Sequence, residues 1–481
     1  MKRTFDEISK HKTIHFIGIG GVGMSGLARI LLAQGYRVSG TDMKETIQTI
    51  RLRDLGATLF YGHDAANLRL ADIVVVSSAI DVNNPELAYA LAEHIPVIKR
   101  GELLGILMQA FAVRIAVCGT HGKTTTSAMT ARALDICGKM PTFVIGADVH
   151  DYGINAVLGE SDFFVAESDE SDGSFLYQEP SVGLFTNLEQ EHMEHYGSLE
   201  NLKEHFLRFM EGIVSRDGIL IINADDPILY ELGQQFPSTA VQWYGLRDDL
   251  SCRADTIVHH AEGVTFQVHL NHGPASEVHL KLMGTHQVYN ALAVIAMGYR
   301  LNLPLDGIIK GLGLFSGTKR RCQLVGESGN IAVYDDYAHH PTEIRVTLEA
   351  LKNSLKRRLI CVFQPHRYSR TKDLLAQFPN AFGAADLTII TEIYAANEAK
   401  IRGLSGKLIV EKMKDNGDAH ALFIPQKSDI ARKLIPLLIP GDIVVLMGAG
   451  DISSVGKELV AQLRHKHEDQ GDKEITHSHQ A

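Results

Sequence analysis

One segment near residue 120 combines the residue types that bind a nucleoside triphosphate. It contains, in direct succession, Gly119, Thr120, His121, Gly122, Lys123, Thr124 and Thr125. In loops of this kind backbone N–H groups and the lysine bind phosphate oxygens, and the threonine hydroxyl after the lysine binds Mg²⁺. The motif is a shortened form, G-x-x-G-K-T. An ordinary strand-to-helix turn is the alternative, but such a turn rarely carries Gly-Lys-Thr-Thr-Thr at the start of a helix.

Two apolar runs predict the strands that position this loop and a carboxylate. Residues 115–118 predict a buried strand directly before the loop, and an apolar helix follows it. A second run, 162–167, ends on Glu167, where nucleotide-hydrolysing folds carry the acid that holds Mg²⁺. We therefore predict that Glu167 is a metal ligand. The acids behind it are interpreted as a solvated loop: Asp169, Glu170 and Asp172.

Further polar residues follow predicted strands or begin a predicted helix. Residues 182–186 predict a strand, and His192 lies in the segment behind it, as a candidate metal ligand or phosphate contact. His286 and Asn290 are four residues apart and therefore share one face of an apolar helix. They could bind a purine or cap the helix, and the sequence leaves both interpretations open.

The N-terminal block carries a second glycine motif. Gly18, Gly20 and Gly23 form G-x-G-x-x-G after the apolar run 14–17, and a later predicted strand ends on Asp42. In a Rossmann-like unit this pattern binds a phosphate at a helix N-terminus, and an acid about 20 residues further on binds the ribose. The motif does not identify the nucleotide, and Asp42 could equally be a turn residue.

Polar clusters also follow the strands predicted in the C-terminal third of the chain. Residues 331–334 predict a strand that leads into Asp336, Tyr337 and His339. Residues 359–363 predict another, which leads into a segment with several arginines. Ligands of open parallel α/β sheets bind at this edge, beyond the carboxyl ends of the strands. The sequence therefore predicts a functional edge in each of three α/β units.

Length and composition favour a globular protein of three domains. The chain has 481 residues, is 45% hydrophobic and has a net charge of -10 without a long basic block, which disfavours a nucleic-acid groove. The five cysteines are scattered and no apolar run suits a signal or membrane span, which favours a cytoplasmic protein. We predict domains at 1–108, 109–318 and 319–463, and a frayed polar tail at 464–481.

These motifs resemble those of the Mur ligases of peptidoglycan synthesis over nearly the whole chain. The resemblance rests on residues 18–26, 119–124, 167–172, 186–187 with 192–193, 335–341 and 364–371, in the right order. It implies a Rossmann-like N-terminal domain, a central P-loop ATPase-like α/β domain and a C-terminal Rossmann-like α/β domain. It also implies that ATP phosphorylates the lactyl carboxylate of UDP-N-acetylmuramate and that the amine of L-alanine attacks the acyl phosphate, leaving ADP and phosphate.

The resemblance implies a role for each matching residue. The UDP-sugar would be bound by Gly20, Gly21, Val22, Gly23, Met24, Ser25, Asp42, His63 and Ser77. ATP would be bound by residues 119–125 with His286, Asn290, Arg321 and Asp336. The catalytic group would comprise Lys123, Glu167, His192, His339, Arg367 and Arg370. Mg²⁺, with two ions expected, would be held by Thr124, Glu167 and His192. The amino-acid side would be lined by Tyr337, His339, Arg367 and Arg370.

Two positions depart from the family pattern, and alternatives remain open. Glu191 stands where the family often has aspartate, which leaves its role as a ligand open, and Cys322 stands where phenylalanine is common. The alternative functions are a recycling ligase that joins a tripeptide to the same UDP-sugar, an NAD-dependent oxidoreductase and a non-catalytic nucleotide switch. The expected partners are small-molecule substrates, with no nucleic acid and no membrane insertion, for a monomer or weak homodimer.

Overall fold

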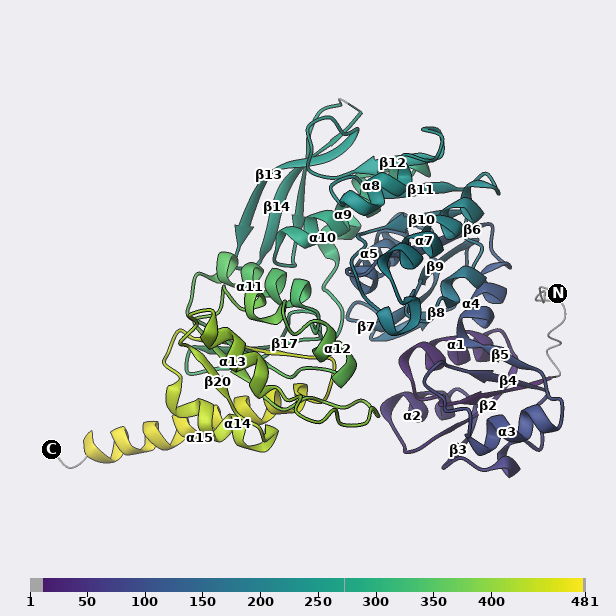
Figure 1. Ribbon diagram of the computed structural model, residues 1–481. Helices are drawn as coiled ribbons and strands as arrows, with labels where there is room; N and C mark the ends of the chain where they lie inside the picture. Colours follow the sequence, from purple (N-terminus) through teal and green to yellow (C-terminus); the bar gives the residue numbers. More distant parts are fainter. Residues whose placement is uncertain (1–11, 272, 479–481) are drawn as a thin grey trace. The chain divides into compact units, whose positions relative to one another are not determined.

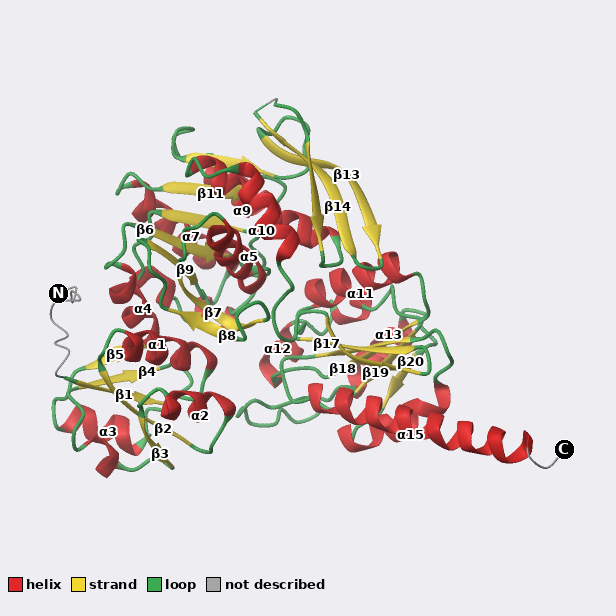
Figure 2. Cartoon of the chain, turned by 180° about the vertical axis from the view of Figure 1, so that it is seen from behind, coloured by secondary structure: helices red, strands yellow, loops and turns green. Residues whose placement is uncertain are grey.

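The computed structural model describes residues 12–271 and 273–478, and within them the chain forms four β-sheets with packed helices (Figures 1 and 2). The chain divides into two compact units. Unit 1 comprises Met1–Ile257, Thr265–Lys281 and Val288–Thr318, and unit 2 comprises Val258–Val264, Leu282–Gln287 and Lys319–Ala481. Within the described ranges, none of the helices has the length and apolar character that crossing a bilayer requires.

The first sheet of unit 1 has five parallel strands in the order β3-β2-β1-β4-β5. Its strands are β1 (Thr13–Ile17), β2 (Arg37–Asp42), β3 (Thr58–Tyr61), β4 (Ile73–Val76) and β5 (Val97–Lys99). Its helices are α1 (Val22–Ala33), α2 (Ile47–Asp54), η2 (Ala65–Leu68), α3 (Pro85–Ala92) and α4 (Arg100–Met108). The strand order reverses between β1 and β4, which is where sheets of this kind bind their ligands.

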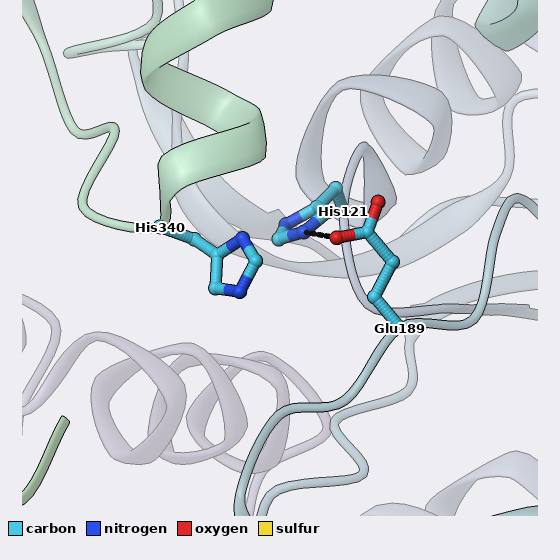
Figure 3. A group of neighbouring side chains, drawn as sticks. All are labelled: His121, Glu189 and His340. Carbon is cyan, nitrogen blue, oxygen red and sulfur yellow. Dashed lines mark ion pairs between the residues drawn. The ribbon is translucent and has the colours of Figure 1, made fainter. Parts of the chain in front are cut away.

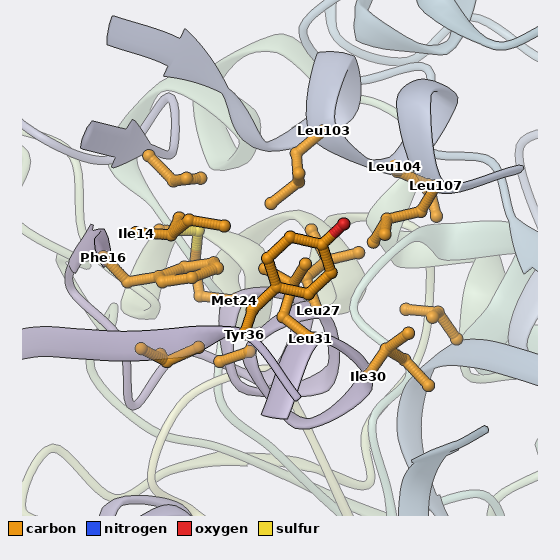
Figure 4. Close-up of a cluster of buried hydrophobic side chains, with 14 of the residues drawn as sticks. Ile14, Phe16, Met24, Leu27, Ile30, Leu31, Tyr36, Leu103, Leu104 and Leu107 are labelled. Atoms are coloured by element: carbon orange, nitrogen blue, oxygen red, sulfur yellow. The ribbon is translucent and has the colours of Figure 1, made fainter. Parts of the chain in front are cut away.

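Alternate residues of β1 pack on opposite faces of this sheet. Ile14 and Phe16 lie in a large apolar cluster to which α1 contributes Leu27 (Figure 4). Ile17 belongs to a smaller cluster on the other face, together with Leu68 of η2. Burying such a side chain contributes about 1.5–3 kcal/mol relative to exposure. Because both faces are buried, β1 is fixed in place, and with it the glycine loop that follows.

The second sheet of unit 1 has seven strands in the order β12-β11-β10-β6-β9-β7-β8, and β8 is antiparallel to β7. The strands are β6 (Val113–Cys118), β7 (Thr142–Val149), β8 (Ile154–Val157), β9 (Phe163–Glu167), β10 (Val182–Phe185), β11 (Ile219–Asn223) and β12 (Val241–Tyr244). The helices are α5 (Lys123–Ile136), η3 (Ser174–Tyr177), α6 (Met193–Tyr196), α7 (Leu199–Val214), α8 (Pro227–Gly233) and α10 (Leu305–Leu314). Since β9, β6 and β10 are neighbouring parallel strands, their carboxyl ends meet at one edge.

A small third sheet and helix α9 include residues of both units. The sheet has the order β13-β14-β15, with β13 (Cys252–His260), β14 (Gly263–Leu270) and β15 (Ser276–Leu280). Helix α9 spans Thr285–Arg300. The segment before it therefore leads from the strands of this sheet to the helix that carries His286 and Asn290.

The sheet of unit 2 has six strands in the order β16-β17-β21-β18-β19-β20, antiparallel between β16 and β17. The strands are β16 (Gln323–Ser328), β17 (Ile331–Asp336), β18 (Leu359–Phe363), β19 (Leu387–Ile390), β20 (Ala421–Phe423) and β21 (Ile443–Met447). The helices are α11 (Pro341–Leu355), α12 (Tyr368–Asp373), η4 (Phe378–Ala381), α13 (Lys407–Asp415), η5 (Lys427–Asp429), α14 (Ile430–Leu434), η6 (Ile435–Leu437) and α15 (Ser453–Ser478).

Helix α15 corrects one expectation. Residues 464–481 were expected to form a frayed tail, but the helix that begins at Ser453 continues through this segment as far as Ser478. No proline interrupts the segment, and its arginine, lysine, glutamate and glutamine residues have good helix propensity. Residues 479–481 lie outside the described residues.

Candidate functional site

The phosphate loop of unit 1 connects β6 to α5 and is fixed by the residues that follow β10. The His121 N–H donates to Asn187 Oδ1 at 2.7 Å, and Thr186 Oγ1 donates to the His121 carbonyl at 2.7 Å. Gly122 caps α5 with a φ of 82°, a left-handed conformation that favours glycine. A Cβ atom on Gly119 would lie 2.2 Å from Thr186 Oγ1. The glycines predicted from the motif are therefore required by the backbone and its neighbours.

Lys123 is paired with Glu170, one of the acids expected to lie in a solvated loop. Its Nζ donates to Glu170 Oε1 at 2.9 Å and to the Thr120 carbonyl at 2.9 Å. Glu170 is buried, so its interpretation as part of a solvated loop is wrong. Although burial lowers the pKa of Lys123, the Glu170 carboxylate raises it above the ordinary value. The loop therefore holds a full positive charge beside a carboxylate, at the position where the motif places the terminal phosphates.

Thr124 and Glu167 meet at the same edge of the sheet. Thr124 Oγ1 donates to Glu167 Oε1 at 2.8 Å, and the Gly146 N–H donates to Glu167 Oε2 at 2.6 Å. A Cβ atom on Gly146 would lie 2.7 Å from that second oxygen. A hydroxyl and a carboxylate are the oxygen ligands that Mg²⁺ prefers. The two predicted metal ligands therefore lie together and suit that ion.

His192 is the N-cap residue of helix α6 and has three carboxylates as neighbours. Its Nε2 atom lies 3.9 Å from Glu170 Oε1 and 4.0 Å from Glu191 Oε2, and its Nδ1 atom lies 3.7 Å from Glu194 Oε1. Burial lowers the pKa of His192, but the three acids together raise it above the ordinary value. Glu191, whose role the sequence left open, is thus a buried neighbour of the predicted ligand.

Replacing His192 with alanine is expected to raise the Mg²⁺ concentration needed for half-maximal activity by about tenfold. Even the loss of a residue that only supports the ligands of a metal site typically lowers metal affinity about 10–100-fold. His195→Ala is the matched control, because His195 lies three residues further on, within α6, and has an exposed side chain. Titrating activity with Mg²⁺ measures the effect. An unchanged Mg²⁺ dependence would show that His192 has only a structural role.

His121 of the phosphate loop also has an acidic neighbour. Its Nε2 atom lies 3.6 Å from Glu189 Oε2 (Figure 3). The Glu189 N–H in turn donates to Thr120 Oγ1 at 2.9 Å. The segment after β10 therefore contacts the loop through both side chains and backbone. The last residue of the predicted loop, Thr125, is buried in the first turn of α5.

Of the two residues expected to bind a purine or cap the helix, His286 lies in the first turn of α9 and Asn290 lies one turn further in. Asn290 lies inside α9 rather than at its end, so it is not a cap. Its Oδ1 atom lies 2.7 Å from the position that a Cβ atom on Gly122 would take, so Asn290 lies against the phosphate loop.

His286 belongs to unit 2. Burial lowers the pKa of His286 to about 4, and nearby Arg321 lowers it further, so the ring is neutral at pH 7.

The residues predicted to bind the UDP-sugar follow the strands of the first sheet at one edge. Asp42, at the end of β2, accepts hydrogen bonds from the Gly20 N–H and the Met43 N–H, both at 2.8 Å. A Cβ atom on Gly20 would lie 2.7 Å from Asp42 Oδ2, so a larger residue there would displace the Asp42 side chain. Asp42 is therefore more than a turn residue, because it holds the glycine loop in place.

The other predicted UDP-sugar residues contribute in different ways. Gly21 precedes the first turn of α1, whose N–H groups lack partners within the helix and can bind an anion. That turn contains Val22, Gly23 and Met24. Met24 and Ser25 have buried side chains, so their contact with a ligand would be through the backbone. Two half-buried side chains complete the edge, His63 after β3 and Ser77 after β4.

In unit 2 the acid predicted to contact the nucleotide is engaged by backbone groups. Asp336 accepts from the Cys322 N–H at 2.6 Å and from the Ala338 N–H at 2.7 Å. Burial raises the pKa of Asp336 to about 6, although Arg321 opposes the shift. The Arg321 guanidinium lies 5.3 Å from the Tyr337 ring centroid. Asp336 thus shapes the loop that presents Tyr337.

The predicted amino-acid residues gather around a histidine that had no assigned role. The His339 and His366 rings lie 6.0 Å apart, Arg370 Nη1 lies 3.1 Å from His366 Nδ1, and Tyr394 stacks on His366 at 5.7 Å. Burial lowers the pKa of His366 to about 3, helped by nearby His339 and arginines. Arg367 has a φ of 68°, a conformation uncommon for an arginine. Within unit 2, the structure thus brings Tyr337, His339 and Arg370 together and places Arg367 beside them.

Comparison with known proteins identifies the family. Residues 13–112 match the model described as Mur ligase family, catalytic domain, residues 117–298 the Mur ligase middle domain, and residues 320–450 the Mur ligase, glutamate ligase domain. A UDP-N-acetylmuramate–L-alanine ligase of Desulfotalea psychrophila is 44% identical over 93% of this chain and 97% of its own length. The chain belongs to the Mur ligase family. This confirms the resemblance and makes it an ATP-dependent ligase.

Other Mur ligases support the same relationship. A UDP-N-acetylmuramate–L-alanine ligase of Myxococcus xanthus is 41% identical over 94% of this chain and 95% of its own length. The crystal structure of a UDP-N-acetylmuramate–alanine ligase of Thermotoga maritima has a TM-score of 0.80 and 30% identity, covering 95% of this chain and 100% of that one. A murein peptide ligase of Psychrobacter arcticus has a TM-score of 0.71 and 26% identity, covering 94% and 99%. The expected fold class of three α/β domains is confirmed, while the exact domain boundaries stay predictions.

Proposed function

We propose that this Mur ligase joins L-alanine to the lactyl carboxylate of UDP-N-acetylmuramate, through an acyl phosphate, and releases ADP and phosphate in peptidoglycan precursor synthesis. The observation that carries the proposal is the nearly full-length similarity, at up to 44% identity, to ligases with that name. The meeting of Lys123, Thr124 and Glu167 at one sheet edge supports it, because these groups suit Mg²⁺ and a triphosphate.

Two Mg²⁺ ions fit the acidic edge of unit 1. Thr124 and Glu167 would hold the first ion, and His192 would hold the second, with Glu167 between them. Bound there, the ions would neutralise the oxygens of the transferred phosphoryl group. Lys123 would bind the β- and γ-phosphates, and its hydrogen bond to Glu170 would break when it does so. Each of these contacts would place positive charge where a carboxylate and a triphosphate must approach each other.

In unit 2 we assign Tyr337, His339, Arg367 and Arg370 to the amino-acid side. Arginine offers a planar pair of donors that matches a carboxylate or phosphate oxygen pair. His286, Asn290, Arg321 and Asp336 are assigned to ATP. The nine residues at the edge of the first sheet are assigned to the UDP-sugar, with the first turn of α1 on its pyrophosphate.

The proposal is tested by phosphate release from ATP with UDP-N-acetylmuramate and one amine at a time. L-alanine should stimulate release strongly, and glycine, other amino acids and the tripeptide L-alanyl-γ-D-glutamyl-meso-diaminopimelate should do so weakly. Stimulation by the tripeptide in preference to L-alanine would assign the chain to the recycling reaction. Release that needs no amine would instead favour a nucleotide switch.

The oxidoreductase alternative makes a different prediction for the first sheet, whose order β3-β2-β1-β4-β5 is also that of dinucleotide-binding folds. We expect UDP-N-acetylmuramate to raise the melting temperature by several degrees at about 100 times its Kd, whereas NAD and NADP leave it unchanged. Thermal denaturation with each ligand measures this. A shift with NAD alone would contradict the proposed function.

A further inference from the structure

A buried polar network lies beneath the edge of the first sheet that we assign to the UDP-sugar. At its centre is Glu86 of α3, whose side chain is fully buried. Glu86 Oε1 accepts from Thr41 Oγ1 at 2.6 Å and from Asn67 Nδ2 at 2.9 Å. Glu86 Oε2 lies 2.8 Å from His63 Nδ1. Because a carboxylate only accepts hydrogen bonds, His63 must carry a proton on Nδ1.

The proton positions further inside the network follow from the same donor and acceptor rules. Burial lowers the pKa of His15 to about 4, so this ring is neutral at pH 7 and has one donor and one acceptor nitrogen. Thr41 uses its only proton on Glu86, so it accepts from His15 Nε2 at 2.9 Å. His15 Nδ1 then accepts from Ser39 Oγ at 2.9 Å. The hydrogen bonds therefore all point one way: Ser39 donates to His15, His15 to Thr41, and Thr41 to Glu86.

His63 is the member of this network that reaches the ligand edge. The Gly62 N–H donates to the Asp42 carbonyl at 2.9 Å, which ties the segment before His63 to the end of β2. Asn67 Nδ2 also lies 3.2 Å from the Gly62 carbonyl. The His63 side chain keeps 17% of its surface exposed. Its Nε2 atom makes no hydrogen bond to any residue in the ranges 12–271 and 273–478.

We propose that Glu86 is a positioning residue for nucleotide recognition: it fixes the ring and the tautomer of His63, so that the unprotonated Nε2 atom is presented as a hydrogen-bond acceptor to an N–H or O–H group of the uridine in the UDP-sugar. This inference rests on the proposed function, which places that ligand at this edge. Glu86 itself would not touch the ligand. It acts through His63, in the way that a carboxylate behind a metal-bound histidine fixes the orientation and tautomer of that ring.

The test is the isosteric substitution Glu86→Gln. A glutamine can still accept from Thr41 and Asn67, but its amide then donates to His63 Nδ1 and forces the ring proton onto Nε2. We expect the Kd for UDP, measured by calorimetry, to rise about tenfold, as expected when one hydrogen bond to a buried polar group is lost. UDP-N-acetylmuramate should show the same factor, while ATP binding should stay unchanged.

A double-mutant cycle separates positioning from a general structural role. In a His63→Ala background, Glu86→Gln should change the Kd for UDP less than twofold, because the residue through which it acts is gone. A tenfold loss in that background, or no loss in the wild-type background, would overturn the inference. If Glu86→Gln does not fold, Asn67→Ala should show the same dependence on His63 with a loss of about threefold. If the wild-type protein binds neither UDP nor the UDP-sugar, the proposed function fails as well.

Discussion

Replacing Lys123 with alanine is expected to reduce ligation at least about 10³-fold while the Kd for UDP-N-acetylmuramate stays within twofold. Removing a single preorganised donor to a developing charge typically costs about 10²–10³ in rate, and Lys123 carries a full charge. Its pKa lies above the ordinary value, because nearby carboxylates outweigh burial, so it is protonated at any assay pH. The UDP-sugar is assigned to a different sheet, which keeps its Glu86 network and its glycine loop.

The matched control for this variant is Lys310→Ala, which removes an exposed lysine of α10 in the same unit. Initial rates of phosphate release and calorimetry with the UDP-sugar measure the two effects. Near-normal turnover of Lys123→Ala would remove the phosphate-loop assignment. A parallel loss of UDP-sugar binding would instead show that the substitution had disturbed the whole unit.

Replacing Glu167 with glutamine is expected to lower kcat/KM by about 10²–10³ and to raise the Mg²⁺ requirement more than His192→Ala does. Glutamine can keep one acceptor for the Thr124 hydroxyl or the Gly146 N–H, so the local structure should persist. The lost group is the negative charge, which we assign to both ions. Its effect should therefore exceed that of His192, which we assign to one.

Glu160→Gln is the control for that variant, because Glu160 is exposed and lies shortly before β9 in the chain. Rates measured over a range of Mg²⁺ concentrations separate a weaker metal site from a slower chemical step. If excess Mg²⁺ fully restores Glu167→Gln, the carboxylate only recruits the ion. If Mg²⁺ dependence and rate both match the wild type, Glu167 is not a ligand.

The phosphate loop and its first carboxylate could be predicted from the sequence because both depend on local patterns. An apolar strand followed by glycines, Lys123 and Thr124 predicts its own structure, and Glu167 ends the next apolar run. Neighbouring parallel strands then place both groups at one edge, as the rule for ligand sites in such sheets requires. The hydrogen bond between Thr124 and Glu167 follows from that arrangement.

Glu170 could not be separated from its exposed neighbours, because its burial depends on a distant contact. Its partner Lys123 lies 47 residues earlier in the chain, and an acidic run shows no periodicity that distinguishes a buried member. The same holds for Glu86, whose partner Thr41 is 45 residues away. His366 was visible within a polar motif, but its stacking on Tyr394 depends on the neighbouring strand. Such pairs are decided by tertiary packing rather than by local sequence.

The transfer of ¹⁸O from the sugar carboxylate to phosphate tests the central claim most directly. A loop that holds the β- and γ-phosphates, with a threonine for Mg²⁺, favours transfer of the γ-phosphoryl group. The carboxylate oxygen would attack phosphorus, ADP would leave, and the amine of L-alanine would then displace phosphate from the acyl carbon. With UDP-N-acetylmuramate labelled in its lactyl carboxylate, mass analysis should find one ¹⁸O in each released phosphate, and ADP as the nucleotide product. Unlabelled phosphate, or AMP among the products, would contradict the acyl-phosphate route.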